Sequence, residues 1–181
     1  MRKLIITEYI TLDGIFEEPG RWSFDFWSEE AARYKADELF ASDVQLLGRV
    51  TYEGFANAWP KMEQETGEFG KKMNAMLKYV VSSTLQNPSW KNTLIISKNI
   101  LEKIQNLKNQ DGGNILVAGS GQLVPFLMAN NLIDEFHFLL HPVVLGKGKR
   151  LFTNPQKFVL QLVETKTLPN GLIALQYVPK K

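Results

Sequence analysis

The sequence predicts a single α/β domain whose mixed, mainly parallel sheet is flanked by helices and ends in a C-terminal antiparallel hairpin. Three observations favour this class. Short apolar runs rich in β-branched residues alternate with helical patterns along most of the 181 residues, as in βαβ units. Near the C-terminus, Pro169-Asn170-Gly171 separates two strand-like runs, which is a strong hairpin signal. No repeat and no linker rich in glycine, serine or proline interrupts residues 1–181, so we expect one domain.

Strands are expected where short apolar runs end at turn residues. The first covers residues 3–10 and precedes a turn at Asp13-Gly14. The last two cover residues 158–167 and 172–178 and form the hairpin. The remaining predicted strands are 44–47, 78–83, 93–97, 115–118 and 135–145.

Helices are expected where apolar residues recur three and four positions apart. Ser28, followed by Glu29 and Glu30, predicts the start of a helix that continues to about residue 41. A hydroxyl can cap the first free N–H groups, and carboxylates favour the positive end of a helix. Further helices are predicted after Gly48 and over residues 69–77, 99–109 and 122–130.

The composition excludes several function classes. A chain with 44% hydrophobic residues is not disordered, and zero cysteines exclude disulfide scaffolds, thiol nucleophiles and thiolate zinc sites. A net charge of +2 is too small to predict nucleic-acid binding. No apolar run approaches the ~20 residues that span a bilayer, and the N-terminus does not resemble a signal peptide, so we expect no membrane partner and a cytoplasmic protein.

The two histidines do not predict a metal site. His137 and His141 lie four apart on a predicted strand, which places them ~13 Å apart along one face, too far to share an ion. We expect His137 at the edge of the core or on the surface, and His141 at a strand end. Hydrolysis is also disfavoured, because Gly119-Ser120-Gly121 lacks the frame of a nucleophile elbow.

Gly48, Arg49 and Thr51 stand between a buried strand and a helix. Free backbone N–H groups at a helix start suit a phosphate, to which Arg49 adds a fork of donors and Thr51 a hydroxyl. The alternative is a tight turn with an exposed arginine and a helix-capping threonine. On spacing alone the two interpretations carry equal weight.

Gly119, Ser120 and Gly121 stand between another buried strand and helix, where a ligand can approach the backbone closely. The segment is not a Rossmann fingerprint, because the third glycine would fall at Val124 and no acid follows ~20 residues later. Two interpretations stand: a glycine-rich turn required by packing, or a phosphate or nicotinamide contact.

Small hydroxyl side chains follow two more strands. Ser82 and Ser83 come after one, and Ser97 with Lys98 after the next, a pairing that suits a phosphomonoester such as the 2′-phosphate of NADP. Each is also explained as a turn or a helix cap. The basic loop at residues 146–150 is either a phosphate contact or a solvated loop.

The order of these segments resembles the dihydrofolate reductase-like superfamily. Within it, the chain is similar to the C-terminal reductase domain of the bifunctional riboflavin-biosynthesis deaminase–reductase. The resemblance covers essentially the whole chain. It is carried by Thr11-Leu12-Asp13-Gly14, Leu47-Gly48-Arg49-Val50-Thr51-Tyr52, Val81-Ser82-Ser83, Val117-Ala118-Gly119-Ser120-Gly121, Ile133-Asp134-Glu135 and His141-Pro142-Val143-Val144-Leu145-Gly146-Lys147-Gly148.

This resemblance implies an NADPH-dependent reductase and assigns its cofactor contacts. Backbone groups near Tyr9 and residues 15–16 would face the nicotinamide amide. The residues implied for the rest of the cofactor fall into three groups: Arg49, Val50 and Thr51 for the pyrophosphate or adenosine phosphate; Ser82, Ser83 and Lys98 for the 2′-phosphate; and Gly119, Ser120, Gly121, Gln122 and Leu123 for the pyrophosphate and the nicotinamide-side ribose.

The resemblance also implies hydride transfer to a C=N or C=O carbon of a small heterocyclic or ribosylaminopyrimidine-like substrate, in a homodimer. The alternative is a nucleotide-binding protein that keeps the cofactor cleft without reductase activity. Glu30 and Asp13 are the candidate proton donors, although Asp13 is also explained as a turn residue. Four aromatic residues either line the substrate side or pack the first helix onto the sheet: Trp22, Phe24, Phe26 and Trp27.

Overall fold

One mixed sheet organises the chain. The computed structural model describes residues 1–153 and 157–180, and these contain eight strands. The strands are β1 (Leu4–Thr11), β2 (Ser42–Gly48), β3 (Leu77–Val81), β4 (Thr93–Ile96), β5 (Asn114–Ala118), β6 (Glu135–His141), β7 (Leu160–Thr167) and β8 (Ile173–Pro179). Their order across the sheet is β4-β3-β2-β5-β1-β6-β8-β7. All pairs from β4 to β6 are parallel, whereas β8 and β7 add two antiparallel pairs, which confirms the predicted fold class.

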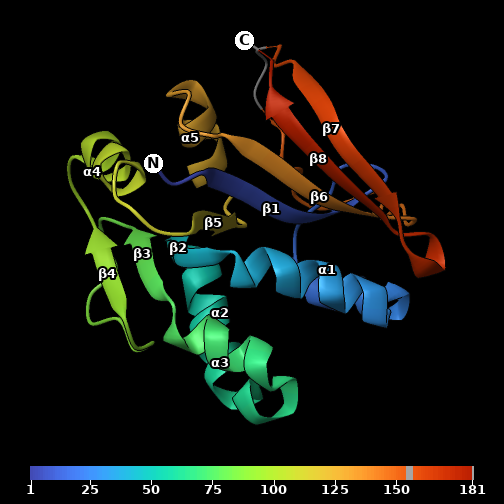
Figure 1. The fold of residues 1–181 in the computed structure, drawn as a ribbon, viewed down its shortest axis with the longest axis horizontal. Helices are drawn as coiled ribbons and strands as arrows, with labels where there is room; N and C mark the ends of the chain where they lie inside the picture. The colour runs from blue at the N-terminus through green and yellow to red at the C-terminus, as the bar shows by residue number, and fades with distance from the viewer. Residues whose placement is uncertain (154–156, 181) are drawn as a thin grey trace.

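Helices cover both faces of the sheet. They are α1 (Glu29–Phe40), α2 (Arg49–Thr66), α3 (Glu68–Ala75), α4 (Ile100–Lys108) and α5 (Leu123–Ala129). Helices α4 and α5 lie on one face, and α1, α2 and α3 lie on the other (Figure 1). No helix in the described ranges has the length and apolar character needed to cross a bilayer.

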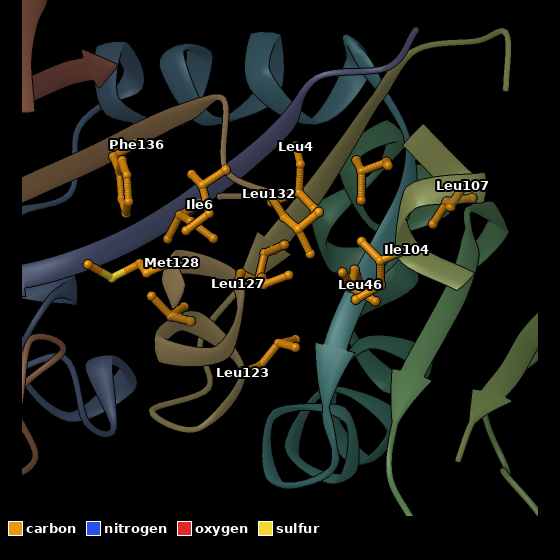
Figure 2. Packing of buried hydrophobic residues seen from close by; sticks show 14 of the residues in the cluster. Leu4, Ile6, Leu46, Ile104, Leu107, Leu123, Leu127, Met128, Leu132 and Phe136 are labelled. Atoms are coloured by element: carbon orange, nitrogen blue, oxygen red, sulfur yellow. The ribbon is translucent and has the colours of Figure 1, made fainter. Parts of the chain in front are cut away.

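The larger core lies on the face covered by α4 and α5. Figure 2 shows side chains from β1, β2, α4, α5 and β6 meeting there, among them Leu4, Ile104 and Leu127, each with no exposed surface. A second cluster on the opposite face includes Leu39 from α1 and Tyr52 from α2. Successive residues of β1 therefore contribute to different cores, because side chains along a strand point alternately to opposite faces of the sheet.

Two local signals from the sequence are confirmed. The Ser28 hydroxyl accepts a hydrogen bond from the N–H of Ala31 at 3.2 Å and caps α1. The C-terminal hairpin turns through Asn170 and Gly171, whose φ angles of 60° and 78° are conformations that asparagine and glycine tolerate best.

Several predicted boundaries are wrong. Strand β6 ends at His141 rather than at residue 145, because Pro142 has no N–H to continue the ladder. Strand β3 ends at Val81, since the Ser82 hydroxyl accepts hydrogen bonds from the next backbone N–H groups and turns the chain. Leu77, predicted to end a helix, pairs with β2 as the first residue of β3. Strand β7 begins at Leu160, not at residue 158.

Candidate functional site

The predicted binding segments follow the carboxyl ends of neighbouring parallel strands. Ser82 follows β3, Arg49 follows β2, Gly119 follows β5 and Leu12 follows β1, and these four strands are consecutive in the sheet. Because parallel strands run in one direction, their carboxyl ends share an edge, which is where ligands bind in open α/β sheets. Segments far apart in the sequence are thereby brought to one edge.

Two of these segments are in direct contact. A Cβ atom on Gly48 would lie 2.2 Å from the Ser120 Oγ, and one on Gly119 would lie 2.6 Å from the Thr51 Oγ1. Gly119 also has a φ angle of +68°, which favours glycine. The packing interpretation of the Gly119 segment is confirmed, and the loops after β2 and β5 pack directly against each other.

Arg49 joins the loops after β2 and β3. Its Nε donates to Glu53 Oε1 and its Nη1 to Thr84 Oγ1, both at 2.7 Å, while 47% of its side chain is exposed. Gly48 caps α2 without a side-chain hydrogen bond, and no acid lies in the first turn of this 18-residue helix. The N–H groups at the start of α2 therefore have no side-chain acceptor, and a guanidinium stands beside them. Thr51 lies inside α2 and does not cap it, so this part of the alternative interpretation is wrong.

The outer members of the predicted set differ in exposure. Ser83 and Gln122 are exposed, and Val50 is 81% exposed, whereas the Leu123 side chain is buried in the core, so only its backbone could face a ligand. Lys98 is exposed after β4, two strands away from β2, in a surface hollow shared with residues of α4 and α5. The predicted cap at Asn99 begins α4 without a side-chain hydrogen bond.

The two candidate proton donors lie in different settings. The Asp13 carboxylate accepts hydrogen bonds from the Thr11 hydroxyl at 2.6 Å and from the N–H groups of Gly146 at 2.8 Å and Leu145 at 3.3 Å. The Thr11 hydrogen bond is the main cause of a lowered pKa for Asp13, which favours the ionised form. Glu30 is exposed in the first turn of α1.

Glu8 is a buried acid that the sequence analysis did not single out. It lies in β1 with 6% of its surface exposed, opposite Phe138 of β6. Burial raises the pKa of Glu8 to about 8, although a hydrogen bond from the Gly119 backbone favours the ionised form. Its Oε1 has no hydrogen-bond partner among the described residues. Strand periodicity is the signal that could have found it, because Glu8 takes an inward position on the face that carries Leu4 and Ile6.

The other face of β1 carries a hydrogen-bonded charged network. Lys35 of α1 contacts both the Thr7 hydroxyl and the Glu38 carboxylate. His137 bridges two acids, through Nδ1 to Glu38 Oε1 at 2.8 Å and through Nε2 to Glu135 Oε2 at 2.9 Å. The prediction of a core-edge histidine is confirmed for His137, whose side chain is 10% exposed, but its partners were not predicted.

Aromatic rings surround His141 at the end of β6. The ring centroids of Tyr9, Trp22 and Phe26 lie 5.4, 5.0 and 5.9 Å from that of His141, which is fully buried. Burial lowers the pKa of His141. The packing interpretation of Trp22 and Phe26 is confirmed. By contrast, Phe24 is 66% and Trp27 38% exposed, so packing does not account for the whole of these two rings.

The sheet order places the chain in the class of α/β domains with a mostly parallel sheet whose strand-end loops gather at one edge. A family model described as the RibD C-terminal domain matches residues 2–174, and the chain belongs to this family, the reductase-domain branch of the dihydrofolate reductase-like superfamily. The resemblance found in the sequence is therefore confirmed.

Relatives and solved structures agree with this family. The chain is 33% identical to the uncharacterised protein YyaP of Bacillus subtilis, over 97% of this chain and 94% of that protein, and 31% identical to YwjB of the same organism, over 98% of each. A Shewanella protein assigned to riboflavin biosynthesis has a similar fold, with a TM-score of 0.79 at 18% identity over 99% of both chains. The Thermotoga maritima diaminohydroxyphosphoribosylaminopyrimidine deaminase/5-amino-6-(5-phosphoribosylamino)uracil reductase gives a TM-score of 0.66 at 16% identity, over 99% of this chain and 57% of that one.

Proposed function

We propose that this protein is an NADPH-dependent reductase that transfers hydride to a C=N or C=O carbon of a small heterocycle of the ribosylaminopyrimidine kind. The observation that carries the proposal is the pairing of Arg49 and the uncapped start of α2 with the Gly119–Gly121 loop at one sheet edge. Membership of a reductase-domain family and the uracil reductase named among the structural neighbours support the substrate class.

The residues present fit a phosphorylated dinucleotide. Arg49 and the N–H groups of Val50 and Thr51 offer donors and positive potential to a pyrophosphate. The backbone from Gly119 to Leu123 would complete that cradle. Half-buried Ser82 and exposed Ser83 and Lys98 would bind the 2′-phosphate, with Lys98 the outermost of the three because it follows β4.

The contribution of the chain to the reaction is mainly positioning. When bound, NADPH supplies the hydride from its nicotinamide ring. The protein would hold the two reacting carbons in contact and exclude water, and the exposed rings of Phe24 and Trp27 would cover a planar substrate. The lowered pKa of Asp13 makes it a poor acid at neutral pH, and Glu30 is exposed, so a bound water is the better candidate for the proton donor.

Calorimetric titration of NADPH into the wild type and Arg49→Ala tests the cofactor site. We expect the variant to bind NADPH roughly tenfold more weakly, since one charge-assisted contact to phosphate is lost. Arg33→Ala is the matched control, because Arg33 is an exposed arginine of α1 and its loss changes the net charge equally. Equal affinities of the two variants would contradict the role of Arg49.

A substrate panel separates the reductase from the alternative function. Pterins, aminopyrimidines and carbonyl compounds would be incubated with NADPH, and its oxidation followed by absorbance. Binding of NADPH without oxidation in any mixture would favour a nucleotide-binding protein that keeps the cleft without the reaction.

We also propose that the protein forms a homodimer through the edge of the sheet at β7. This outermost strand exposes Leu162 by 47% and Val163 by 61%, an apolar edge that a second copy could cover. Sedimentation velocity should give the mass of a dimer at micromolar concentration. A monomer under those conditions would overturn the assignment.

A further inference from the structure

Glu8 is an isolated acid in an apolar cluster. In β1 it shares a face with Leu4, Ile6 and Ile10, which belong to or pack against the larger core. Helix α5, on the same face, contains only apolar side chains. An ionised carboxylate is costly in such a place, so the neutral acid is the stable form there.

The charged groups nearest to Glu8 do not offset its burial. Across the sheet, the Lys35 ammonium favours ionisation of Glu8 and the Glu38 carboxylate opposes it, so their fields act in opposite directions. Strand β5 supplies no ionisable side chain, and Glu17, in the loop after β1, is paired with Lys149 at 2.8 Å. What remains within hydrogen-bond reach is the N–H of Gly119.

A neutral carboxylic acid in this position has a hydroxyl donor for which the described part of the chain provides no acceptor. Its carbonyl oxygen can accept from Gly119, but the other oxygen carries a proton and has no acceptor among the described residues. A buried donor without a partner costs free energy, so this hydroxyl needs an acceptor from outside the chain, such as a ligand. The register of β1 with β5 pairs Thr7 with Ala118, so Glu8 lies beside the Gly119 loop at the edge described above.

We propose that Glu8 is a ligand-binding residue that donates a hydrogen bond from its neutral carboxylic acid to the carboxamide oxygen of the nicotinamide ring. This inference rests on the proposed function, because it takes the ligand of the Gly119–Gly121 loop to be the dinucleotide. A carboxamide provides the uncharged carbonyl acceptor that the Glu8 hydroxyl lacks. Ionisation of Glu8 removes this donor and places a negative charge against the carbonyl.

The test compares two ligands that differ only at the nicotinamide end. NADPH and 2′-phospho-ADP-ribose, which has no nicotinamide ring, would be titrated by calorimetry into the wild type, Glu8→Gln and Glu8→Leu at pH 7 and pH 9.5. For the wild type, we expect NADPH affinity to fall about tenfold at the higher pH, while the affinity for 2′-phospho-ADP-ribose changes equally in all three proteins.

The variants separate the hydrogen bond from a general structural effect. Glu8→Gln keeps an uncharged donor, so its NADPH affinity should match that of the wild type at pH 7 and lack the additional loss at pH 9.5. Glu8→Leu should bind NADPH about tenfold more weakly at pH 7 and bind 2′-phospho-ADP-ribose normally. Lys78, whose pKa burial lowers to about 8, titrates in the same window but does so in every variant.

Three outcomes would overturn the inference. One is an equal loss of affinity for both ligands in Glu8→Leu. Another is a Glu8→Gln protein whose NADPH affinity depends on pH as that of the wild type does. If Glu8→Leu fails to fold by circular dichroism, the Glu8→Gln comparison decides alone. Absence of binding of either ligand to the wild type is the third, and it alone would also reject the proposed function.

Discussion

The two faces of β1 hold two buried glutamates in opposite states. Glu8, on the face of α5, has a pKa raised by burial to about 8. Glu38 reaches the other face from α1, with 5% of its side chain exposed. Burial alone would raise its pKa too, but the Lys35 ammonium and the His137 hydrogen bond lower it to about 2. Glu8 and Glu38 are both buried glutamates, so the groups around each one determine whether its carboxyl is ionised.

The difference shows how the buried polar groups on the two faces of β1 are bonded. On the α1 face the charges form a closed network, since Lys35, Glu38, His137 and Glu135 each have a partner. A network of this kind orders the packing of α1 on the sheet. On the α5 face a single acid is left incompletely bonded beside the Gly119 loop. The Lys35–Glu38–His137–Glu135 network is therefore structural, and the incompletely bonded Glu8 is where we place a ligand contact.

Removing the Glu38 carboxylate should have the largest effect. In Glu38→Ala, the Lys35 ammonium, whose side chain is 12% exposed, loses its counter-charge while it stays largely buried. We expect the free energy of unfolding to fall by about 4 kcal/mol, the usual cost of breaking a buried ion pair. Urea denaturation measures the change.

The control for this variant is Asp37→Ala, an exposed acid one position away on the same helix. Its effect should stay within about 0.5 kcal/mol. If both variants had the same stability, the α1 face would be no more dependent on its charges than the surface is, and the contrast between the two faces would fail.

A smaller effect is expected from pH on the Glu8 side. The pKa of Glu8 is higher in the folded state than in the unfolded chain, so its contribution to stability is present at low pH and is lost as pH rises toward about 8. Between pH 5 and pH 8, the wild type should lose about 3 kcal/mol relative to Glu8→Gln, at about 1.4 kcal/mol per pH unit. Parallel urea denaturations of the two proteins give this difference.

The comparison with Glu8→Gln cancels the other titrating groups in that range. His141, whose pKa is lowered by burial, contributes equally to both proteins. Identical pH profiles would mean that Glu8 is already ionised at pH 5, and the neutral acid on the α5 face would have to be abandoned.

The local architecture was largely predictable from the sequence. Short apolar runs located every strand that the structure describes, and Asn170-Gly171 located the hairpin, because both depend on residues close together in the chain. The misplaced start of β3 at Leu77 depends on pairing with β2, which local pattern does not state, whereas the end of β6 at His141 was predictable from Pro142. The candidate site was predictable in part for the same reason. The sequence identified Gly48 and Gly119 as turn residues between a strand and a helix, but it did not show that each lies against the other's loop.

By itself, the sequence determined the fold class, the family and the strand-end segments, because periodicity, turn residues and motif order are properties of neighbouring residues. Only the tertiary structure decided which segments meet and which acids are charged. Glu38 meets His137 across 99 positions of sequence, and Glu8 meets the Gly119 backbone across more than a hundred. Desolvation and Coulomb interactions depend on distances in space, so the same side chain became a charged anchor on one face of β1 and a neutral acid on the other.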